Sequence, residues 1–450
     1  MIYKVIKIFL IITTIIAFIW GFSDSYSSHT LDNIVHVVAI GIDKVHDDNN
    51  MKVSFQFVNM SSGGDGSSIG EASTVVTSIN TSTINKAINL MNSYIGKELN
   101  FSHCKVIVFS EEFAKEGIST EICTLTNNEE IRPSTNIVVS TSEANTYLKN
   151  SNPNIEKVVT NYYDTFELTS NFTGYSDDAT IGDFYNKIFS SSSANTAILG
   201  RTFQKVSSSQ SSSQDQAGSA EGTSQGNDQG GGEGSSGGEG NYSSEGGDAG
   251  KSSGGNAEQN DSGGASLEIS GQRGTQNVGI AVFRDAKYIG QLSEIDSICH
   301  LLVTDNVDSF IISIPLEGYP DNLLDLNVSS VRSTGIKVDT SSNSPQISVS
   351  VYCEAKALTV DANSNYDSIT LKKLSKDGEE FLKKQIETYL NKTSKEFNSD
   401  IASFSNKAIT NFLTEEDWKN YNWMSKYKNA NFTVKVDFDV TSSLLFTGNQ

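Results

Sequence analysis

One tract of the sequence cannot take part in a hydrophobic core and therefore divides the rest of the chain. Residues 207–264 are almost entirely Ser, Gly, Gln, Asn, Asp and Glu, and they hold 17 of the 36 glycines of the 450-residue chain. Such a composition buries too little apolar surface to offset the entropy lost on ordering, so we expect a disordered, flexible linker. A coil of this length has an end-to-end distance of roughly 40 Å.

The charge of the chain argues against a nucleic-acid partner. The net charge is −21, and the linker contributes −8 of it through nine acidic residues and one lysine. Phosphate recognition requires clustered Lys and Arg side chains, so we expect no binding to nucleic acid. Hydrophobic residues make up 36% of the chain, which is enough for folded α+β domains on either side of the linker.

Residues 1–22 predict a membrane anchor or a signal segment. Lys4 and Lys7 precede an uncharged run over 8–22, whose length lies within the range of signal peptides. With Lys7 snorkelling, the helix could also cross a bilayer. The next Lys or Arg is Lys44, so the positive-inside rule places the short N-terminus in the cytoplasm and the rest outside. Because no A-x-A cleavage site follows, an uncleaved anchor is favoured over a cleaved signal peptide, with a buried core helix as a third alternative.

The segment before the linker predicts an N-terminal α+β domain over residues 30–150. Apolar runs and alternating patterns predict strands, and apolar residues at helical spacing predict a helix over 83–95. The order β-β-β-α-β-α-β favours a mixed sheet. The expected strands are 34–42, 51–59, 74–79, 101–109 and 135–140, with a helix that Ser110 caps and that begins at Glu111.

A second, smaller domain is expected from residues 151–206 and 265–315, with the linker as an interruption. Thr180 and Asp183 resemble a capping box at the start of a helix in this domain. Residues 316–450 are expected to form a C-terminal α+β domain. The expected elements after the linker are paired strands at 278–283 and 287–289, strands at 309–315, 346–357 and 431–440, and a helix-rich stretch over 369–409.

Two short motifs match functional patterns without the structural context that gives them meaning. Residues 66–70 match G-x-S-x-G with Ser68 as nucleophile, but this elbow must follow a strand and open a helix. Here strand-like residues follow it, and linker residues 234–238 match the pattern equally well. Residues 232–237 match G-x-G-x-x-G, again inside the linker. We therefore expect no catalytic residue and no cofactor.

The histidines and acidic residues are not spaced like metal ligands, so we expect no metal site. His103 and Cys104 are adjacent on a predicted strand, where their side chains point to opposite faces. An acidic turn after the first strand could offer oxygen ligands to Ca²⁺, although an ordinary polar hairpin turn is favoured. The residues of this turn are Asp43, His46, Asp47 and Asp48.

The cysteines and two acidic pairs are interpreted as structural. No C-x-x-C occurs, which argues against zinc ribbons and redox dithiols. Buried free thiols are favoured, with a disulfide as the alternative. The cysteines are Cys104, Cys123, Cys299 and Cys353. The pairs Glu129–Glu130 and Asp177–Asp178 are interpreted as solvated loop or cap positions.

Four segments, in this order along the chain, resemble the GerC family of spore germination proteins. The last hundred residues, including Trp418 and the final strand, also fit, so the resemblance covers nearly all of the chain outside the linker. The segments are VVAIGIDKVHDDNNMKVSFQFVN (37–59), KELNFSHCKVIVFSEEFAKEGI (97–118), EIRPSTNIVVS (130–140) and NVGIAVFRDAKYIGQLS (277–293).

The resemblance implies a non-enzymatic C subunit of a spore germinant receptor, made of three α+β domains, on the outer face of the inner spore membrane. Its implied partners are the membrane-embedded A subunit, the transporter-like B subunit and the membrane itself. The complex would sense a small-molecule germinant, which the resemblance does not assign to one subunit. The alternatives are an extracellular solute-binding or envelope module unrelated to germination, and an envelope hydrolase that depends on Ser68.

The chain departs from the family just before the first domain. Members of the family usually carry a lipobox Cys there, whereas residues 23–28 of this chain contain none. We therefore expect the N-terminal apolar segment to replace the lipid as the anchor.

Overall fold

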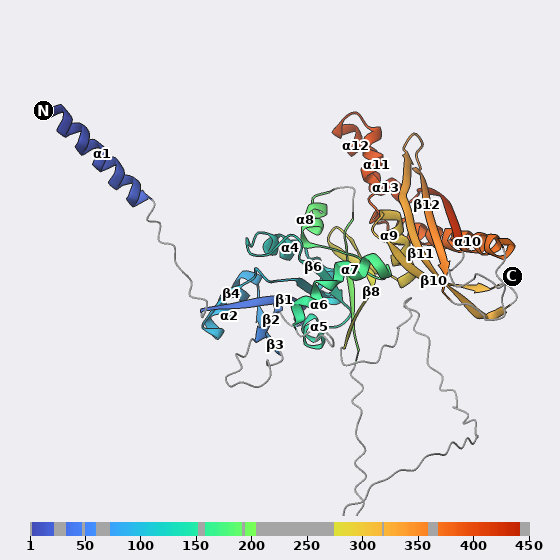
Figure 1. Ribbon diagram of the computed structural model, residues 1–450, viewed down its shortest axis with the longest axis horizontal. Helices are drawn as coiled ribbons and strands as arrows, with labels where there is room; N and C mark the ends of the chain where they lie inside the picture. The colour runs from blue at the N-terminus through green and yellow to red at the C-terminus, as the bar shows by residue number, and fades with distance from the viewer. Residues whose placement is uncertain are drawn as a thin grey trace, which may run out of the picture. The chain divides into compact units, whose positions relative to one another are not determined.

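The computed structural model describes an α+β protein with two mixed sheets (Figure 1). The residues that it describes are 2–21, 33–46, 50–59, 73–151, 158–190, 194–203, 274–316, 319–358 and 368–441. The expected linker over 207–264 lies outside them.

The first sheet is built around β1 (Ile34–Lys44), which is buried from Val37 to Asp43. β1 forms an antiparallel hairpin with β2 (Met51–Asn59), as the alternating pattern predicts, and β3 (Ser73–Thr81) follows at the edge. The strand order is β3-β2-β1-β5-β6-β7-β8-β9, and β4 also pairs with β1. The bounds are β4 Glu98–Asn100, β5 Val106–Ser110, β6 Asn136–Ser140, β7 Thr196–Thr202, β8 Thr275–Arg284 and β9 Lys287–Leu292.

Helices cover both faces of this sheet, which explains why its strands are apolar on both sides. One face packs against α2, α3, α4 and α8, and the other against α5, α6 and α7. The hydroxyls of Thr83, Ser110 and Thr180 accept backbone N–H groups at the starts of α2, α3 and α8, so the predicted caps of α3 and α8 are confirmed. The bounds are α2 Ile84–Ile95, α3 Glu111–Glu116, α4 Ser119–Thr126, α5 Ala144–Asn150, α6 Val159–Tyr163, α7 Thr165–Thr173 and α8 Ile181–Ile188.

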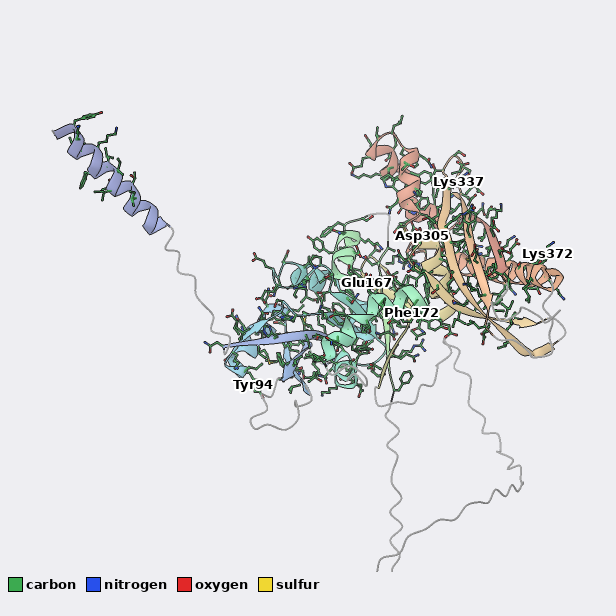
Figure 2. All side chains as sticks on the ribbon, viewed as in Figure 1. Tyr94, Glu167, Phe172, Asp305, Lys337 and Lys372 are labelled. Carbon is green, nitrogen blue, oxygen red and sulfur yellow. The ribbon has the colours of Figure 1, made fainter. Side chains whose placement is uncertain are left out.

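The second sheet has the order β10-β11-β12-β13 and one solvated face. Burial alternates along β12 (Gln346–Ala357) and β13 (Asn431–Thr441), as the sequence predicts for strands with one face in the core. The inner face packs against α9 (Glu294–Thr304) and α10 (Ser368–Asn391). Lys337 on β11 and Lys372 on α10 point outward (Figure 2). The other bounds are β10 Ser309–Leu316, β11 Tyr319–Asp339, π-helix η2 Lys392–Glu396, α11 Ser405–Ala408, 3-10 helix η3 Ile409–Asn411, α12 Glu415–Tyr421 and α13 Trp423–Tyr427.

The strands in residues 151–206 and 265–315 do not form a sheet of their own, in contrast to the predicted second domain. β7 pairs in parallel with β6, and β8 and β9 extend the same sheet, while β10 begins the second sheet. The third domain implied by the family resemblance is therefore not distinguished as a further sheet in the described residues. The predicted strand over 101–109 is shorter than expected because the chain turns at Phe101, whose carbonyl accepts the N–H of Cys104.

The described residues on either side of the expected linker are neighbours in the first sheet. β7 and β8 are antiparallel neighbours, and the pairing continues to Phe203, whose N–H donates to the carbonyl of Gly274 at 2.8 Å. An insertion between such paired ends adds only a slowly growing loop-closure entropy.

The N-terminal segment is helical, as α1 (Ile2–Gly21). None of the described helices combines the length and the hydropathy needed to cross a membrane. The membrane anchor therefore stays a prediction.

Removal of residues 207–264 is expected to preserve the fold, because residues 204–206 and 265–273 would still connect β7 to β8. The shorter loop should raise the free energy of unfolding by about 1–2 kcal/mol. Urea denaturation of the full chain and of the deletion variant measures this difference. A deletion variant that no longer unfolds cooperatively would contradict the β7–β8 arrangement.

Replacement of Gly378 by Ala is expected to destabilise the protein, although Ala normally favours a helix by about 1 kcal/mol over Gly. A Cβ at Gly378 in α10 would overlap the buried ring of Phe438 on β13. Overpacking of this kind costs about 1–3 kcal/mol, so we expect a net loss.

Urea denaturation of Gly378→Ala and of Lys384→Ala, an exposed position on the same helix, tests this packing. Lys384→Ala should change the free energy of unfolding by less than about 0.5 kcal/mol. A stabilised Gly378→Ala protein would mean that α10 does not pack on β13 as described.

Candidate functional site

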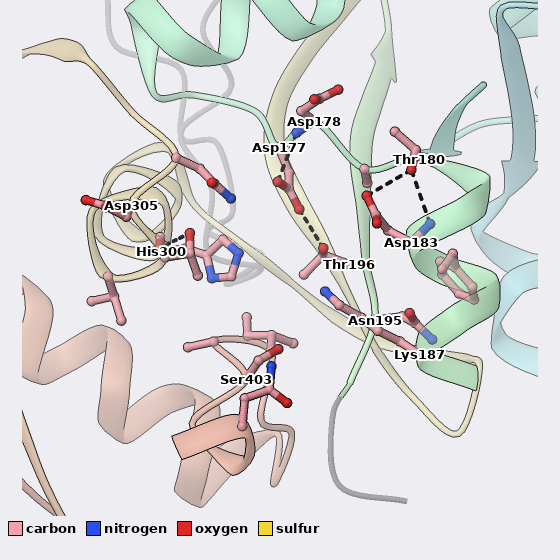
Figure 3. A pocket seen from close by; sticks show the side chains of 18 of the residues that line it. Asp177, Asp178, Thr180, Asp183, Lys187, Asn195, Thr196, His300, Asp305 and Ser403 are labelled. Carbon is pink, nitrogen blue, oxygen red and sulfur yellow. Dashed lines mark hydrogen bonds between the residues drawn. The ribbon is translucent and has the colours of Figure 1, made fainter. Parts of the chain in front are cut away.

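A cavity of about 370 Å³ lies among residues that come from both sides of the linker (Figure 3). Its walls are the segment 177–180, α8, the start of β7, the C-terminal half of α9, part of β11, and residues 401–407. Asn195, Thr196 and His300 are buried, whereas Asp305 and Lys407 lie at the exposed rim.

The carboxylate of Asp400 organises the wall formed by residues 401–407. It accepts hydrogen bonds from the backbone N–H groups of Phe404 and Ser405 and from the indole N–H of Trp423, at 2.8–2.9 Å. Burial raises the pKa of Asp400 to about 6, although these N–H donors oppose the shift. The loop includes Ser403 in the left-handed region, at φ 56°, a conformation that few non-glycine residues adopt.

Asp177 and Asp178 form an acidic wall. Asp177 is 7% exposed, and its carboxylate accepts the hydroxyl of Thr196 at 2.5 Å and the N–H of Asp178 at 2.9 Å. Asp178 accepts from the amide of Asn136. Burial raises the pKa of Asp178 to about 6, and the negative charges of neighbouring acidic residues add to this. The interpretation of this pair as solvated positions was therefore wrong for Asp177, which is buried against Thr196, whereas Asp178 is half-buried.

His300, on α9, lines the cavity and packs edge-to-face on Tyr389 of α10. Its Nδ1 forms a hydrogen bond with the Tyr389 hydroxyl at 2.8 Å, and in the described part of the chain Nε2 has no hydrogen-bond partner. Burial lowers the pKa of His300 to about 4. The positive charge of Lys187 lowers it further, while the negative charge of Asp177 opposes the shift. The ring is therefore neutral at pH 7.

Two further polar groups of the cavity are unmatched. Asn195 is 4% exposed, and its Oδ1 has no hydrogen-bond partner among the described residues. The Lys187 ammonium, on α8, forms no ion pair with any described residue. A buried polar group without a partner, such as the Asn195 Oδ1, costs about 1–3 kcal/mol and is rare in native proteins unless a ligand or water satisfies it. Lys187 is half-buried.

The buried residue of the acidic turn considered for Ca²⁺ is Asp43, and it stabilises the start of a helix. The carboxylate of Asp43 accepts the backbone N–H groups of Ala144 and Asn145 at the start of α5, at 2.5 and 3.0 Å. The Nδ1 of His46 lies 3.3 Å from the Oε1 of Glu112. Asp47 and Asp48 lie outside the described residues. Among the residues that are described, no group of three or more His, Cys, Asp and Glu side chains could hold a metal ion.

The other candidates from the sequence are structural or not described. His103 packs edge-to-face on His36, with ring centroids 4.9 Å apart. The Glu130 carboxylate accepts from the Asn100 amide and the Phe101 N–H, so it fixes the turn after β4 instead of being merely solvated. Ser68 and the motif at 232–237 lie outside the described residues.

All four cysteines are free thiols, which confirms the favoured interpretation over a disulfide. Burial raises the pKa of Cys104 and of Cys353 to about 12 and raises that of Cys299 as well. These thiols are therefore protonated and unreactive at neutral pH.

Comparison with known proteins gives matches on both sides of the linker. Residues 27–201 match the family model described as spore germination protein N-terminal domain. Residues 278–443 match the model described as spore germination B3/GerAC like, C-terminal.

A putative spore germination protein of Bacillus subtilis (strain 168), YfkR, is 28% identical over 117 residues. This match covers 25% of the chain and 30% of YfkR. The aligned part of the chain therefore spans about a third of the length of this curated relative. The crystal structure of the GerBC protein is similar with a TM-score of 0.49 and 13% identity, over 89% of this chain and 96% of that one.

The buried imidazole of His300 is expected to make stability depend on pH. Because the folded-state pKa of about 4 lies below the usual value of about 6.5, the unfolded state binds a proton first as the pH falls. Stability is therefore fully present above about pH 6.5 and is lost progressively toward pH 4. At pH 5 the loss amounts to about 2 kcal/mol.

Urea denaturation of the wild type and of His300→Gln at pH 7 and pH 5 isolates this effect, because Asp178 and Asp400 titrate in both proteins. The wild type should lose about 2 kcal/mol more than the variant between the two pH values. An equal loss in both proteins would contradict a buried neutral imidazole.

Proposed function

Because the chain belongs to the family of GerAC-type spore germination proteins, we propose that it is the non-enzymatic C subunit of a spore germinant receptor. The observation that carries the proposal is the pair of family matches in order, over 27–201 and 278–443, across both halves of the fold. The proposed partners are the receptor's A and B subunits.

The arrangement of the first sheet supports a role that involves the whole chain. The N-terminal match ends within β7 and the C-terminal match begins within β8, and these two strands are neighbours in one sheet. The two matched regions therefore share a core, so a subunit lacking either half would leave a sheet edge open.

The proposal places the protein on the outer face of the inner spore membrane, held by α1. Lys4 and Lys7 are the only charged residues of this helix. Several of its described apolar side chains are exposed, which supports an environment of lipid or protein around them. Tyr3, Phe9 and Leu10 are the most exposed of them, at 82, 67 and 60%.

Polar groups of the cavity are engaged in ways that support binding over catalysis. The Asp177 carboxylate is held by Thr196 and by a backbone N–H, and the His300 Nδ1 by Tyr389. A general base needs an acceptor atom within hydrogen-bond reach of the proton that it removes. The contacts of Asp177 and His300 already engage part of their hydrogen-bonding groups.

Deletion of the gene in a strain without a paralogue is expected to abolish nutrient-triggered germination, while germination by an agent that bypasses receptors continues. Loss of optical density after nutrient addition is the measurement. Expression of the full-length chain should restore germination, and the A and B subunits should copurify with it. Normal nutrient germination in the deletion strain would contradict the proposal.

The mature N-terminus is expected to be Met1, in the membrane fraction of spores. Mass spectrometry of the fractionated protein measures it. A start between Gly21 and Thr30 would show cleavage and contradict the anchor. A matched chain with Ile11 and Ile12 changed to Lys should leave the membrane fraction, because each buried Lys costs about 2.5–3.5 kcal/mol at a bilayer centre.

A further inference from the structure

We propose that the cavity beside His300 is a binding site for a small zwitterion of the amino-acid class, with Lys187 facing its carboxylate and the Asp177–Asp178 wall facing its ammonium. This inference goes beyond the receptor role and does not depend on it, because direct binding to the purified chain decides it.

The floor of the cavity offers hydrogen bonds that nothing in the described structure uses. The Asn195 Oδ1 is buried and unpartnered, and it lies in the cavity wall beside Thr196. The Nε2 of His300 has no partner in the described part of the chain. Figure 3 shows Asp177, Asn195 and His300 around the same space, each from a different element. A ligand with both donors and acceptors would satisfy these groups.

The charges of the cavity require both signs on the ligand. Asp177, Asp178, Asp183 and Asp305 all line it, so a simple anion would meet four carboxylates. A metal cation would meet the ammonium groups of Lys187 and, at the rim, Lys407, and the described residues contain no cluster suited to a metal ion. Lys187 and Asp177 both line the cavity and both act electrostatically on His300, so charges of both signs lie near the same space.

The size and the remaining wall fit a small organic molecule. A volume of about 370 Å³ lies within the range of small-molecule sites. Phe184, Val303, Ile401 and Ala402 form apolar parts of the lining, and each is at most 8% exposed. They would contact the aliphatic part of a side chain, while the polar floor fixes the ammonium and the carboxylate.

Two of the lining residues, Asp305 and Ser403, adopt left-handed backbone conformations, at φ 65° and 56°. Such conformations persist where surrounding contacts enforce them, and they are common next to ligands. Asp305 is held by the Thr334 N–H, which donates to its carboxylate at 3.2 Å. The rim is therefore fixed in advance of binding, which reduces the entropy that a ligand must offset.

Calorimetric titration of the full-length protein in detergent tests the proposal with the standard L-amino acids as probes. At least one should bind saturably below about 10 mM. Its N-acetyl derivative, which lacks the ammonium, and its carboxamide, which lacks the carboxylate, should each bind at least about tenfold more weakly. No saturable binding, or equal binding of either derivative, would overturn the proposal.

Variants locate the binding in this cavity. Lys187→Met should weaken binding at least about tenfold, and Asn195→Leu should weaken it as well. Lys383→Met, at an exposed position on α10, is the matched control and should bind like the wild type. Thermal unfolding confirms that each variant is folded, and if Asn195→Leu does not fold, Lys187→Met alone decides. A folded Lys187→Met protein with unchanged affinity would show that the ligand binds elsewhere.

Discussion

The pairing of β7 with β8 is the interaction on which the rest of the structure depends. These strands lie on opposite sides of a long polar tract, yet they are adjacent in the first sheet. β7 begins at Thr196, next to Asn195, whose side-chain Oδ1 has no partner among the described residues. β8 leads through β9 into α9, which carries His300. The cavity walls from the two halves are therefore in place only when this pair has formed. The pair therefore joins the two family-matched halves in one core and one site.

Structural features that depend on residues close together in the sequence could be predicted. The alternation in β2, β12 and β13 and the caps Ser110 and Thr180 were predicted, because period and capping chemistry lie within a few residues. β11 was missed, because Asn327, Ser329 and Gly335 favour turns in isolation. Pairing with β10 on one side and β12 on the other overrides that preference.

The candidate site was mostly hidden from sequence reasoning. Asp177 and Asp178 form an acidic pair of the kind usually solvated, yet Asp177 is buried and accepts a hydrogen bond from Thr196 at the start of β7. His300 stands in an apolar helical stretch where a histidine is unusual, which was the one available signal. Its partner Tyr389 lies 89 residues away, so no local pattern could connect the two. Burial shifts the pKa values of two of these groups in opposite directions. It raises the pKa of Asp400 and lowers that of His300, because in both cases it disfavours the charged form.

The position of the polar tract affects the order in which the protein can fold during synthesis. β7 leaves the ribosome long before β8, since the chain between Phe203 and Gly274 must be made first. At about 5–20 residues per second, that delay lasts roughly 4–14 seconds. For this time the apolar edge of a nascent parallel sheet has no neighbour, and such edges template aggregation. The acidic, glycine-rich composition of the tract keeps the intervening chain soluble during this delay. The large sequence separation between β7 and β8 makes their pairing a late step of folding.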